Sequence, residues 1–217
     1  MYQNILFDLD GTLINTGVGV CASVAYAIEK LGLPALPDAE LKTFIGPPIS
    51  VSLKTKFNLS DELIEQGTQY FRDKYSTVGY LQAEVYDGIF DLLKLLKQQG
   101  KKIGVATFKR QDYAEKVLQK FGLAEYFDCI WGSGMTLDVL QTKQEIINAC
   151  VDDLSSGDKS TVVMIGDSKF DAEGAATAGV DFIGVAYGYG FSTKADIDEY
   201  NNVLAADTVE ELIAYFA

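Results

Sequence analysis

The stretch Thr161-Val162-Val163-Met164-Ile165-Gly166 is an almost unbroken apolar run, and Asp167 follows it directly. A central strand of a parallel sheet has this composition, because helices cover it on both faces. A second buried strand is expected over residues 3–8, where a short apolar run ends at the carboxylate of Asp8. Both predicted strands therefore end in a carboxylate.

Strand and helix patterns alternate from about residue 86 to the end of the chain. The expected strands cover 102–107, 128–131, 161–166, 181–186 and 203–205, and the expected helices cover 89–100, 110–121, 142–151, 171–178 and 208–216. Thr208 and Glu211 have the spacing of a capping box for the last helix. This alternation predicts right-handed crossovers and a doubly wound, mostly parallel, Rossmann-like α/β sheet. Ligands bind such sheets beyond the carboxyl ends of the strands.

Residues 16–81 interrupt this pattern with a purely helical one. Helices are expected from Thr16 to the stop at Gly32 and over 38–44, 49–57 and 61–77, the last with Ser60 as its N-cap. We interpret 16–81 as a small inserted helical cap, and 1–15 with 82–217 as the α/β core. The two connections, near 14–17 and 80–86, can hinge.

Composition excludes several kinds of chemistry. The 217 residues hold 18 Lys and Arg against 31 Asp and Glu, a formal charge of −13, and they hold no histidine. Histidine-based triads, histidine-ligated zinc and imidazole general bases are therefore excluded. The acid excess argues against nucleic-acid polymers and anionic membranes as partners. A phosphate pocket remains possible where a metal or local cations reverse the field.

The chain also carries signals about its compartment. Cys21, Cys129 and Cys150 are widely spaced and odd in number, which is typical of reduced thiols in a cytoplasmic protein. The first residues contain neither the pattern of a signal peptide nor that of a membrane span. We expect a cytoplasmic protein without a membrane partner, and nothing indicates an obligate protein partner.

Polar side chains gather where the expected strands end. Asp8 and Asp10 follow the first strand, Thr107 ends the next, and Asp167 and Asp171 follow 161–166, while Lys143 opens an intervening helix. If these ends converge, the clustered carboxylates repel one another unless a cation lies among them. Ligand sets made only of oxygen favour Mg²⁺.

At this point the residues match a family. Asp8-Leu9-Asp10-Gly11-Thr12-Leu13 resembles the first motif of the haloacid dehalogenase-like hydrolases, and Val105-Ala106-Thr107 resembles the second. Lys143 fits the third motif, and Gly166-Asp167-x-x-x-Asp171 with the alanines and glycine up to Gly179 fits the fourth. With its helical insertion, the chain resembles the capped branch that contains phosphoglycolate phosphatases and 5′-nucleotidases. The stretch 44–48 resembles the cap loop of those proteins.

The resemblance implies a role for each matching residue. Asp8 would be the nucleophile that forms an aspartyl-phosphate, and Asp10 would protonate the leaving oxygen and then activate water. Mg²⁺ would be held by Asp8, the backbone carbonyl of Asp10, and Asp167. Asp171 would orient this metal shell or Lys143. Thr107 and Lys143, with the backbone N–H groups from Leu9 to Gly11, would hold the transferring oxygens.

Some of these assignments stay open at the level of sequence. Lys159 is an alternative to Lys143 as the phosphate-binding lysine of the third motif, because Lys143 is assigned only from its spacing within a variable region. Lys109 and Arg110 either meet the substrate phosphate or only cover the start of a helix. Gly46 and Pro47 either touch substrate or only separate two helices.

The chain departs from the family pattern at two places. Asn15-Thr16 stands where an acidic residue often follows the first motif, and Phe108 occupies a position that is commonly small. Neither change removes a group that the chemistry needs. Both alter the expected shape of the substrate pocket.

The favoured function is a Mg²⁺-dependent phosphomonoesterase acting on a small phosphate ester such as phosphoglycolate or a nucleoside monophosphate. The second Asp of the first motif argues against dehalogenases and phosphonoacetaldehyde hydrolases, which lack it. Phosphosugar mutases of the same superfamily are associated with a histidine near the cap hinge, and this chain has none. A phosphoryl-accepting signalling protein and an inactive scaffold are further alternatives. The leaving group, the cap residues that contact it and the oligomeric state stay undetermined by sequence.

Overall fold

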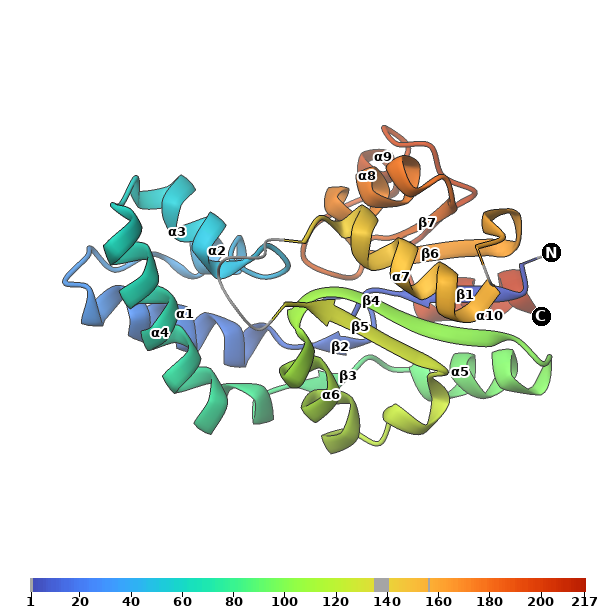
Figure 1. Ribbon diagram of the computed structural model, residues 1–217, viewed down its shortest axis with the longest axis horizontal. Helices are drawn as coiled ribbons and strands as arrows, with labels where there is room; N and C mark the ends of the chain where they lie inside the picture. The colour runs from blue at the N-terminus through green and yellow to red at the C-terminus, as the bar shows by residue number, and fades with distance from the viewer. Residues whose placement is uncertain (1, 135–140, 156) are drawn as a thin grey trace.

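A six-stranded sheet forms the centre of the computed structural model, which describes residues 2–134, 141–155 and 157–217 (Figure 1). The strands are β1 (Asn4–Phe7), β4 (Lys102–Arg110), β5 (Cys129–Ser133), β6 (Val162–Gly166), β7 (Asp181–Val185) and β8 (Leu204–Ala206). They pair in the order β5-β4-β1-β6-β7-β8, and every pairing is parallel. The expected doubly wound α/β sheet is confirmed.

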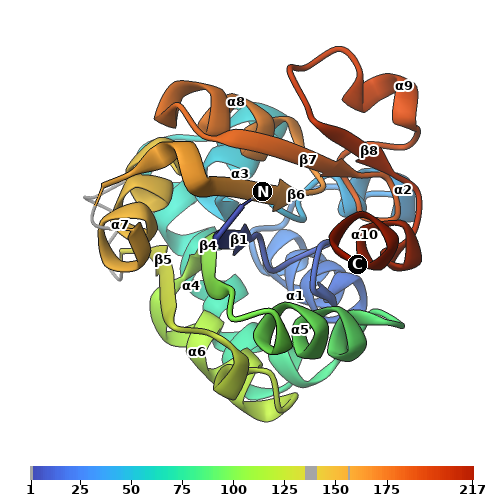
Figure 2. The same cartoon turned by 90° about the vertical axis from the view of Figure 1, so that its right-hand side faces the viewer.

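Helices cover both faces of this sheet (Figure 2). One face carries α5 (Ile89–Gln98), α6 (Gln111–Lys120) and α10 (Val209–Phe216), and the other carries α7 (Lys143–Ser155), α8 (Lys169–Ala178) and α9 (Lys194–Ile197). Successive residues of a strand point to opposite faces. Accordingly Ile5 and Phe7 of β1 pack with α5 and α10, whereas Leu6 packs with α7 and α8. Both halves of the core depend on this alternation.

Four helices lie beyond one end of the sheet, on the side opposite the chain termini (Figure 1). They are α1 (Gly17–Lys30), α2 (Asp38–Lys42), α3 (Ile49–Phe57) and α4 (Asp61–Thr77), and the 3₁₀ turn η1 (Gly79–Leu81) follows them. Their own apolar cluster includes Val24, Ile28, Leu53 and Tyr75. The division of the chain into a cap and a core stays a prediction of the sequence.

Two very short strands were not predicted. β2 (Ile14–Asn15) and β3 (Glu84–Val85) pair antiparallel where the chain leaves the sheet for the four helices and returns from them. Two residues are too few to show a strand pattern in sequence. Four short helical segments, α9, η1, η2 (Ala124–Tyr126) and η3 (Lys159–Thr161), also escaped prediction, because three or four residues are too few to show a helical period.

Local details differ from expectation at two points. β4 continues to Arg110, with a pairing irregularity between Ala106 and Arg110, so Thr107 lies within the strand and not at its end. Thr208 accepts the N–H of Glu211 at 3.4 Å, as predicted. The Glu211 carboxylate, however, accepts the N–H of Asp207 at 3.0 Å. The predicted capping box is therefore only half formed, because Glu211 bonds one residue further back.

The helices in the ranges 2–134, 141–155 and 157–217 include none that is both long enough and apolar enough to cross a membrane. Cys21, Cys129 and Cys150 are free thiols, and Cys150 is buried.

The backbone of α1 lies in close contact with the segment that leads from α4 back to the sheet. The N–H of Gly19 donates to the carbonyl of Gln82 at 3.1 Å, and a Cβ on Gly19 would lie 1.9 Å from the carbonyl oxygen of Gly79. A Gly→Ala change in an open helix stabilises it by about 1 kcal/mol. Here overpacking should reverse the sign, so that Gly19→Ala lowers the free energy of unfolding by about 1–3 kcal/mol.

Urea denaturation measures this change. Val18→Ala, at an exposed neighbouring position, serves as the control and should shift stability by less than about 0.5 kcal/mol. A Gly19→Ala protein that is more stable than the wild type would contradict the close approach of α1 to η1.

Candidate active site

The carboxyl ends of three adjacent strands form the floor of the site. β1 lies between β4 and β6, and the chain runs to β4 and β5 on one side of β1 before it crosses to β6 on the other. Such a reversal leaves a crevice at the carboxyl edge of the sheet. Asp8 follows β1, Asp167 follows β6 and Thr107 lies near the end of β4. The convergence predicted from the sequence is therefore present.

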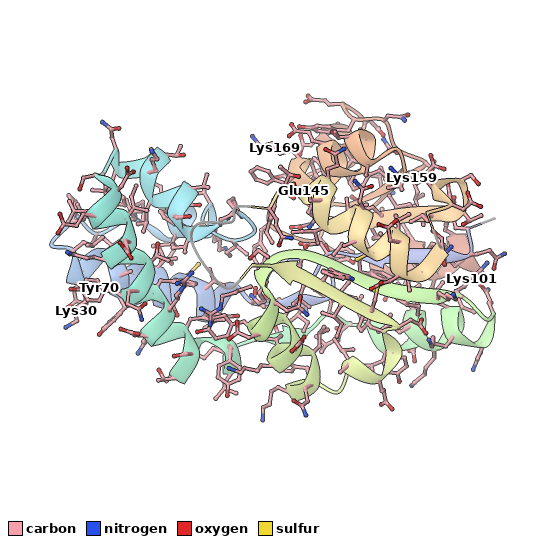
Figure 3. All side chains as sticks on the ribbon, in the orientation of Figure 1. Lys30, Tyr70, Lys101, Glu145, Lys159 and Lys169 are labelled. Carbon is pink, nitrogen blue, oxygen red and sulfur yellow. The ribbon has the colours of Figure 1, made fainter. Side chains whose placement is uncertain are left out.

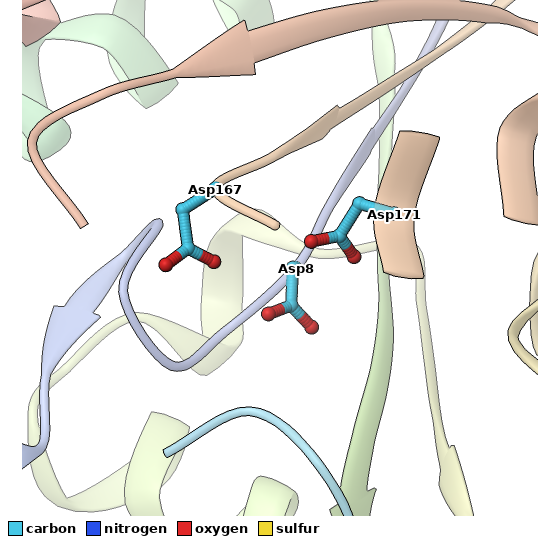
Figure 4. Close-up of side chains that lie close together, drawn as sticks. All are labelled: Asp8, Asp167 and Asp171. Carbon is cyan, nitrogen blue, oxygen red and sulfur yellow. The ribbon is translucent and has the colours of Figure 1, made fainter. Parts of the chain in front are cut away.

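Three carboxylates meet at this edge (Figure 4). Asp8, Asp167 and Asp171 each offer an oxygen, and these oxygens lie within 4.8 Å of one another. The side chains are almost fully buried, with residue exposures of 5%, 3% and 0%. Asp171 belongs to the first turn of α8, where it accepts both the N–H and the hydroxyl of Ser168, at 3.1 and 2.6 Å.

Lys143 supplies the positive charge in this cluster. Its Nζ lies 2.8 Å from Asp8 Oδ1 and 2.6 Å from Asp171 Oδ1, and the residue is 5% exposed. Burial alone would lower the pKa of Lys143, but Asp171 and Asp8 hold it above its usual range. Lys159 belongs to η3, which precedes β6 and so lies at the opposite edge of the sheet (Figure 3). The structure thus brings Lys143, and not Lys159, to the carboxylates.

One ammonium does not balance three buried carboxylates. Burial, opposed by Lys143, raises the pKa of Asp8 to about 6. Burial and the neighbouring Asp171 and Asp8 raise the pKa of Asp167 to about 8. A set of buried oxygen ligands with surplus negative charge suits a hard divalent cation. The residues present therefore fit a metal ion held between Asp8 and Asp167.

Asp10 has different partners. Its carboxylate accepts the hydroxyl of Thr16 at 2.7 Å and forms an ion pair with Lys109 at 2.7 Å. Lys109 also lies over the ring of Tyr75, 4.9 Å from its centroid. Sequence reasoning noted Thr16 only as a departure from the family pattern, and nothing in the sequence indicated that it would bond to Asp10. Lys109 lies at the site and does not merely cover the start of a helix, because its side chain is only 7% exposed and pairs with Asp10; contact with a substrate phosphate stays a prediction.

Gly11 and a distant loop pack around Asp167. Gly11 has a φ of +87°, and a Cβ on it would lie 2.3 Å from Asp167 Oδ2. The same oxygen accepts the N–H of Tyr189 at 2.7 Å and that of Gly190 at 3.2 Å. The Tyr189 hydroxyl accepts the N–H of Gly17 at 2.8 Å. Tyr189 therefore connects two parts of the site: its backbone bonds to Asp167, and its hydroxyl bonds to the start of α1. Sequence analysis did not identify this residue.

The remaining sequence candidates lie in β4 and in a pocket beside Asp10. Thr107 is buried, and its hydroxyl accepts the N–H of Lys109 at 3.2 Å. Gly46 and Pro47 line a pocket of about 130 Å³ that also borders Asp10. Phe108 lines the same pocket and lies under the Lys143 ammonium, 5.4 Å from its ring centroid. The large side chain at position 108 therefore forms part of the pocket wall.

The raised pKa values of Asp8 and Asp167 predict how the free energy of unfolding depends on pH when a chelator keeps the site free of metal ions. Asp8 and Asp167 keep their protons in the folded protein at pH values where the unfolded chain has lost them. The stability that they contribute is present below about pH 4 and is lost as pH rises through about 6 for Asp8 and about 8 for Asp167. The free energy of unfolding in EDTA should therefore fall across this range.

Denaturant titrations at successive pH values measure this loss. Asp167→Asn should flatten the curve between pH 6 and 8, whereas Asp91→Asn, at an exposed position, should leave it unchanged. Identical curves for the wild type and Asp167→Asn would contradict the raised pKa of Asp167.

Comparison with known proteins gives a consistent assignment. Residues 5–185 match the family model described as haloacid dehalogenase-like hydrolase. A 5′-nucleotidase from Pseudomonas aeruginosa is 35% identical over 190 residues, which cover 87% of this chain and 85% of that protein. The tyrosine-protein kinase PtkA from Mycobacterium tuberculosis is 33% identical, over 97% of this chain and 71% of that protein. A phosphoglycolate phosphatase from Vibrio parahaemolyticus is 27% identical, over 98% and 95%.

Comparison with solved structures leads to the same family. The crystal structure of a predicted phosphatase from Clostridium acetobutylicum has a TM-score of 0.90 and 34% sequence identity, over 98% of this chain and 96% of that one. The family resemblance seen in the sequence motifs is thereby confirmed. The chain belongs to the haloacid dehalogenase-like hydrolase family.

Proposed function

We propose that the protein is a Mg²⁺-dependent phosphomonoesterase that acts on a small phosphate ester through an aspartyl-phosphate on Asp8. The observation that carries this proposal is the division of labour between two aspartates separated by one residue. Asp8 lies in the buried cluster with Lys143 and Asp167, whereas Asp10 borders the pocket and is bonded to Thr16 and Lys109.

In this proposal Mg²⁺ is held by Asp8, Asp167 and the backbone carbonyl of Asp10. When bound, it neutralises charge on the cluster and on the transferring phosphoryl group. Asp171 then acts on Lys143, because it forms an ion pair with the ammonium and is itself fixed by Ser168.

Asp8 makes the first bond. A carboxylate oxygen of Asp8 attacks phosphorus as the bond from phosphorus to the ester oxygen breaks, so the phosphoryl group moves to Asp8 and the leaving group departs as an alcohol. The Lys143 ammonium orients Asp8 and, with the Thr107 hydroxyl and the N–H groups from Leu9 to Gly11, stabilises negative charge on the phosphoryl oxygens.

Asp10 acts as the general acid and then as the general base. It donates a proton to the leaving oxygen in the first step, and in the second it takes one from the water that attacks phosphorus and releases phosphate from Asp8. The Thr16 hydroxyl and the Lys109 ammonium both bond to Asp10 and fix the direction of its carboxylate.

Residues 16–81 act in this proposal as a cap that closes over the substrate, with Gly46 and Pro47 contacting it. Asn15 lies at the base of the cap and bonds to the hydroxyl of Tyr189, so movement of the cap is transmitted to the loop that holds Asp167. The free thiols and the acidic composition support a cytoplasmic location and a small-molecule substrate.

Phosphate release tests the chemistry. With Mg²⁺ the protein should hydrolyse members of a panel of phosphoglycolate, nucleoside monophosphates, sugar phosphates and aryl phosphates, and EDTA should abolish turnover. Asp8→Asn should lower kcat by at least about 10³-fold because the nucleophile is lost. Asp91→Asn is the matched control on the surface. Folded wild-type protein that releases no phosphate from any ester would contradict the proposal.

The panel should include ATP with a tyrosine-containing peptide, because one relative is named as a tyrosine-protein kinase. We expect transfer to water and no phosphorylation of the peptide. Phosphopeptide formation that Asp8→Asn abolishes would show that the acceptor is tyrosine instead.

The proposed role of Asp10 predicts that the Asp10→Asn protein forms the aspartyl-phosphate but hydrolyses it slowly. With 4-nitrophenyl phosphate, whose leaving group needs little protonation, Asp10→Asn should still phosphorylate Asp8 but hydrolyse the intermediate about 10²–10⁴-fold more slowly. Rapid mixing should show a burst of one nitrophenolate per protein followed by slow turnover. Uniform slowing without a burst would contradict Asp10 as the base of the second step.

A further inference from the structure

The pocket that borders Asp10 is formed largely by one face of α4. Thr68, Phe71, Arg72 and Tyr75 all line it, and their spacing of three and four residues places them on one side of the helix. Tyr75 lies beside Lys109, which bonds to Asp10. Arg72 precedes Tyr75 by three residues, so its backbone lies about 4.5 Å further along the helix axis. The pocket therefore extends from the catalytic end at Asp10 toward Arg72.

The walls of this pocket are mainly apolar. The lining residues from the cap and from the core include five aromatic rings and a proline: Phe44, Pro47, Phe71, Tyr75, Phe108 and Tyr113. Its volume of about 130 Å³ is close to that of protein cavities of about 150 Å³ that hold a benzene ring. The space between the ester oxygen and Arg72 thus suits a group with a ring-sized apolar body.

The cations of the pocket differ in their partners. Lys109 is paired with Asp10, and Arg110 binds Asp112 through both Nε and Nη2. Within the part of the chain that the structure describes, the Arg72 guanidinium forms neither an ion pair nor a hydrogen bond with a side chain. Burial and the neighbouring Arg110 lower the pKa of Arg72, and the Asp112 carboxylate, which is already bonded to Arg110, offsets this shift only in part. A half-buried cation whose neighbouring carboxylate is already bonded to another cation is poorly compensated, and a bound anion would relieve it.

We propose that Arg72 is a specificity-determining residue that binds a negatively charged group on the leaving group of the substrate. The substrate class is a phosphate monoester whose leaving group has a ring-sized apolar body and ends in a carboxylate. The planar guanidinium matches a carboxylate through two parallel hydrogen bonds. This inference rests on the proposed phosphatase function and adds the chemistry of the leaving group.

A matched pair of substrates tests the assignment. Wild-type protein should hydrolyse 4-carboxyphenyl phosphate with a kcat/KM roughly 10- to 100-fold above that for phenyl phosphate. Arg72→Gln should remove this preference, so that the kcat/KM values for the two esters come within about twofold of each other. Lys74→Gln removes a charge from the same helix, at a side chain that lies over Tyr26 instead of the pocket, and should keep the preference.

Product binding gives a readout that does not need turnover. By calorimetry, 4-hydroxybenzoate should bind the wild type and the Lys74→Gln protein at least tenfold more tightly than phenol does, and Arg72→Gln should abolish this difference. Arg72→Lys, which keeps the charge and loses the planar fork, should recover part of it.

The outcomes separate the two proposals. Hydrolysis of both esters at equal rates, unchanged by Arg72→Gln, would overturn the role of Arg72 and leave the phosphatase function intact. Absence of all hydrolysis with Arg72-dependent binding of 4-hydroxybenzoate would overturn the phosphatase function but support the anion site. Absence of both would overturn both.

Discussion

The structure of the site depends on the contact of one buried ammonium with two buried carboxylates. Lys143 is the first residue of α7, where a positive charge opposes the helix dipole, so its position there is favoured by Asp8 and Asp171 and not by the helix. Removing either partner of such a pair would leave an uncompensated charge in a region from which water is excluded. Because Asp8 follows β1, Asp171 belongs to α8 and Lys143 begins α7, this contact also fixes three elements relative to one another.

The sheet explains why these groups meet although they are far apart in sequence. β1 is central, and the strands on its two sides are reached by crossovers in opposite directions, so the ends of β4 and β6 flank Asp8. β1 and β6 are short and apolar, and each is followed directly by a carboxylate, whereas β4 is longer and carries Thr107 within its second half. The same apolar runs that form the core therefore determine where the carboxylates lie. Gly11 completes the arrangement, because only a residue without Cβ leaves room for Asp167.

Sequence predicted the sheet, the helical insertion and the cluster because each has a strong local pattern. The six predicted strands, the D-x-D motif at Asp8 and the G-D motif at Gly166 are visible without any tertiary information. The choice between Lys143 and Lys159 was not visible, because both lie before β6 at distances that a variable loop permits, and only the fold places Lys159 at the opposite edge. Tyr189 and Thr16 were missed because their roles are hydrogen bonds to Asp167 and Asp10, which no spacing in the chain encodes.

Charge pairing within the site indicates where its ligands bind. Lys143 is balanced by Asp8 and Asp171, Lys109 by Asp10, and Arg110 by Asp112. Among the described residues that line the cluster and the pocket, Asp167 is bonded only to backbone N–H groups, and Arg72 forms no ion pair because the neighbouring Asp112 is bonded to Arg110. A cation beside Asp167 and an anion beside Arg72 would complete the pairing. The net charge of −13 repels anionic esters only weakly at physiological salt, where fields decay over about 8 Å. Recognition in the proposed reaction therefore depends on these local groups: a cation beside Asp167 would attract the phosphoryl end of the substrate, and Arg72 would attract an anionic group at the other end.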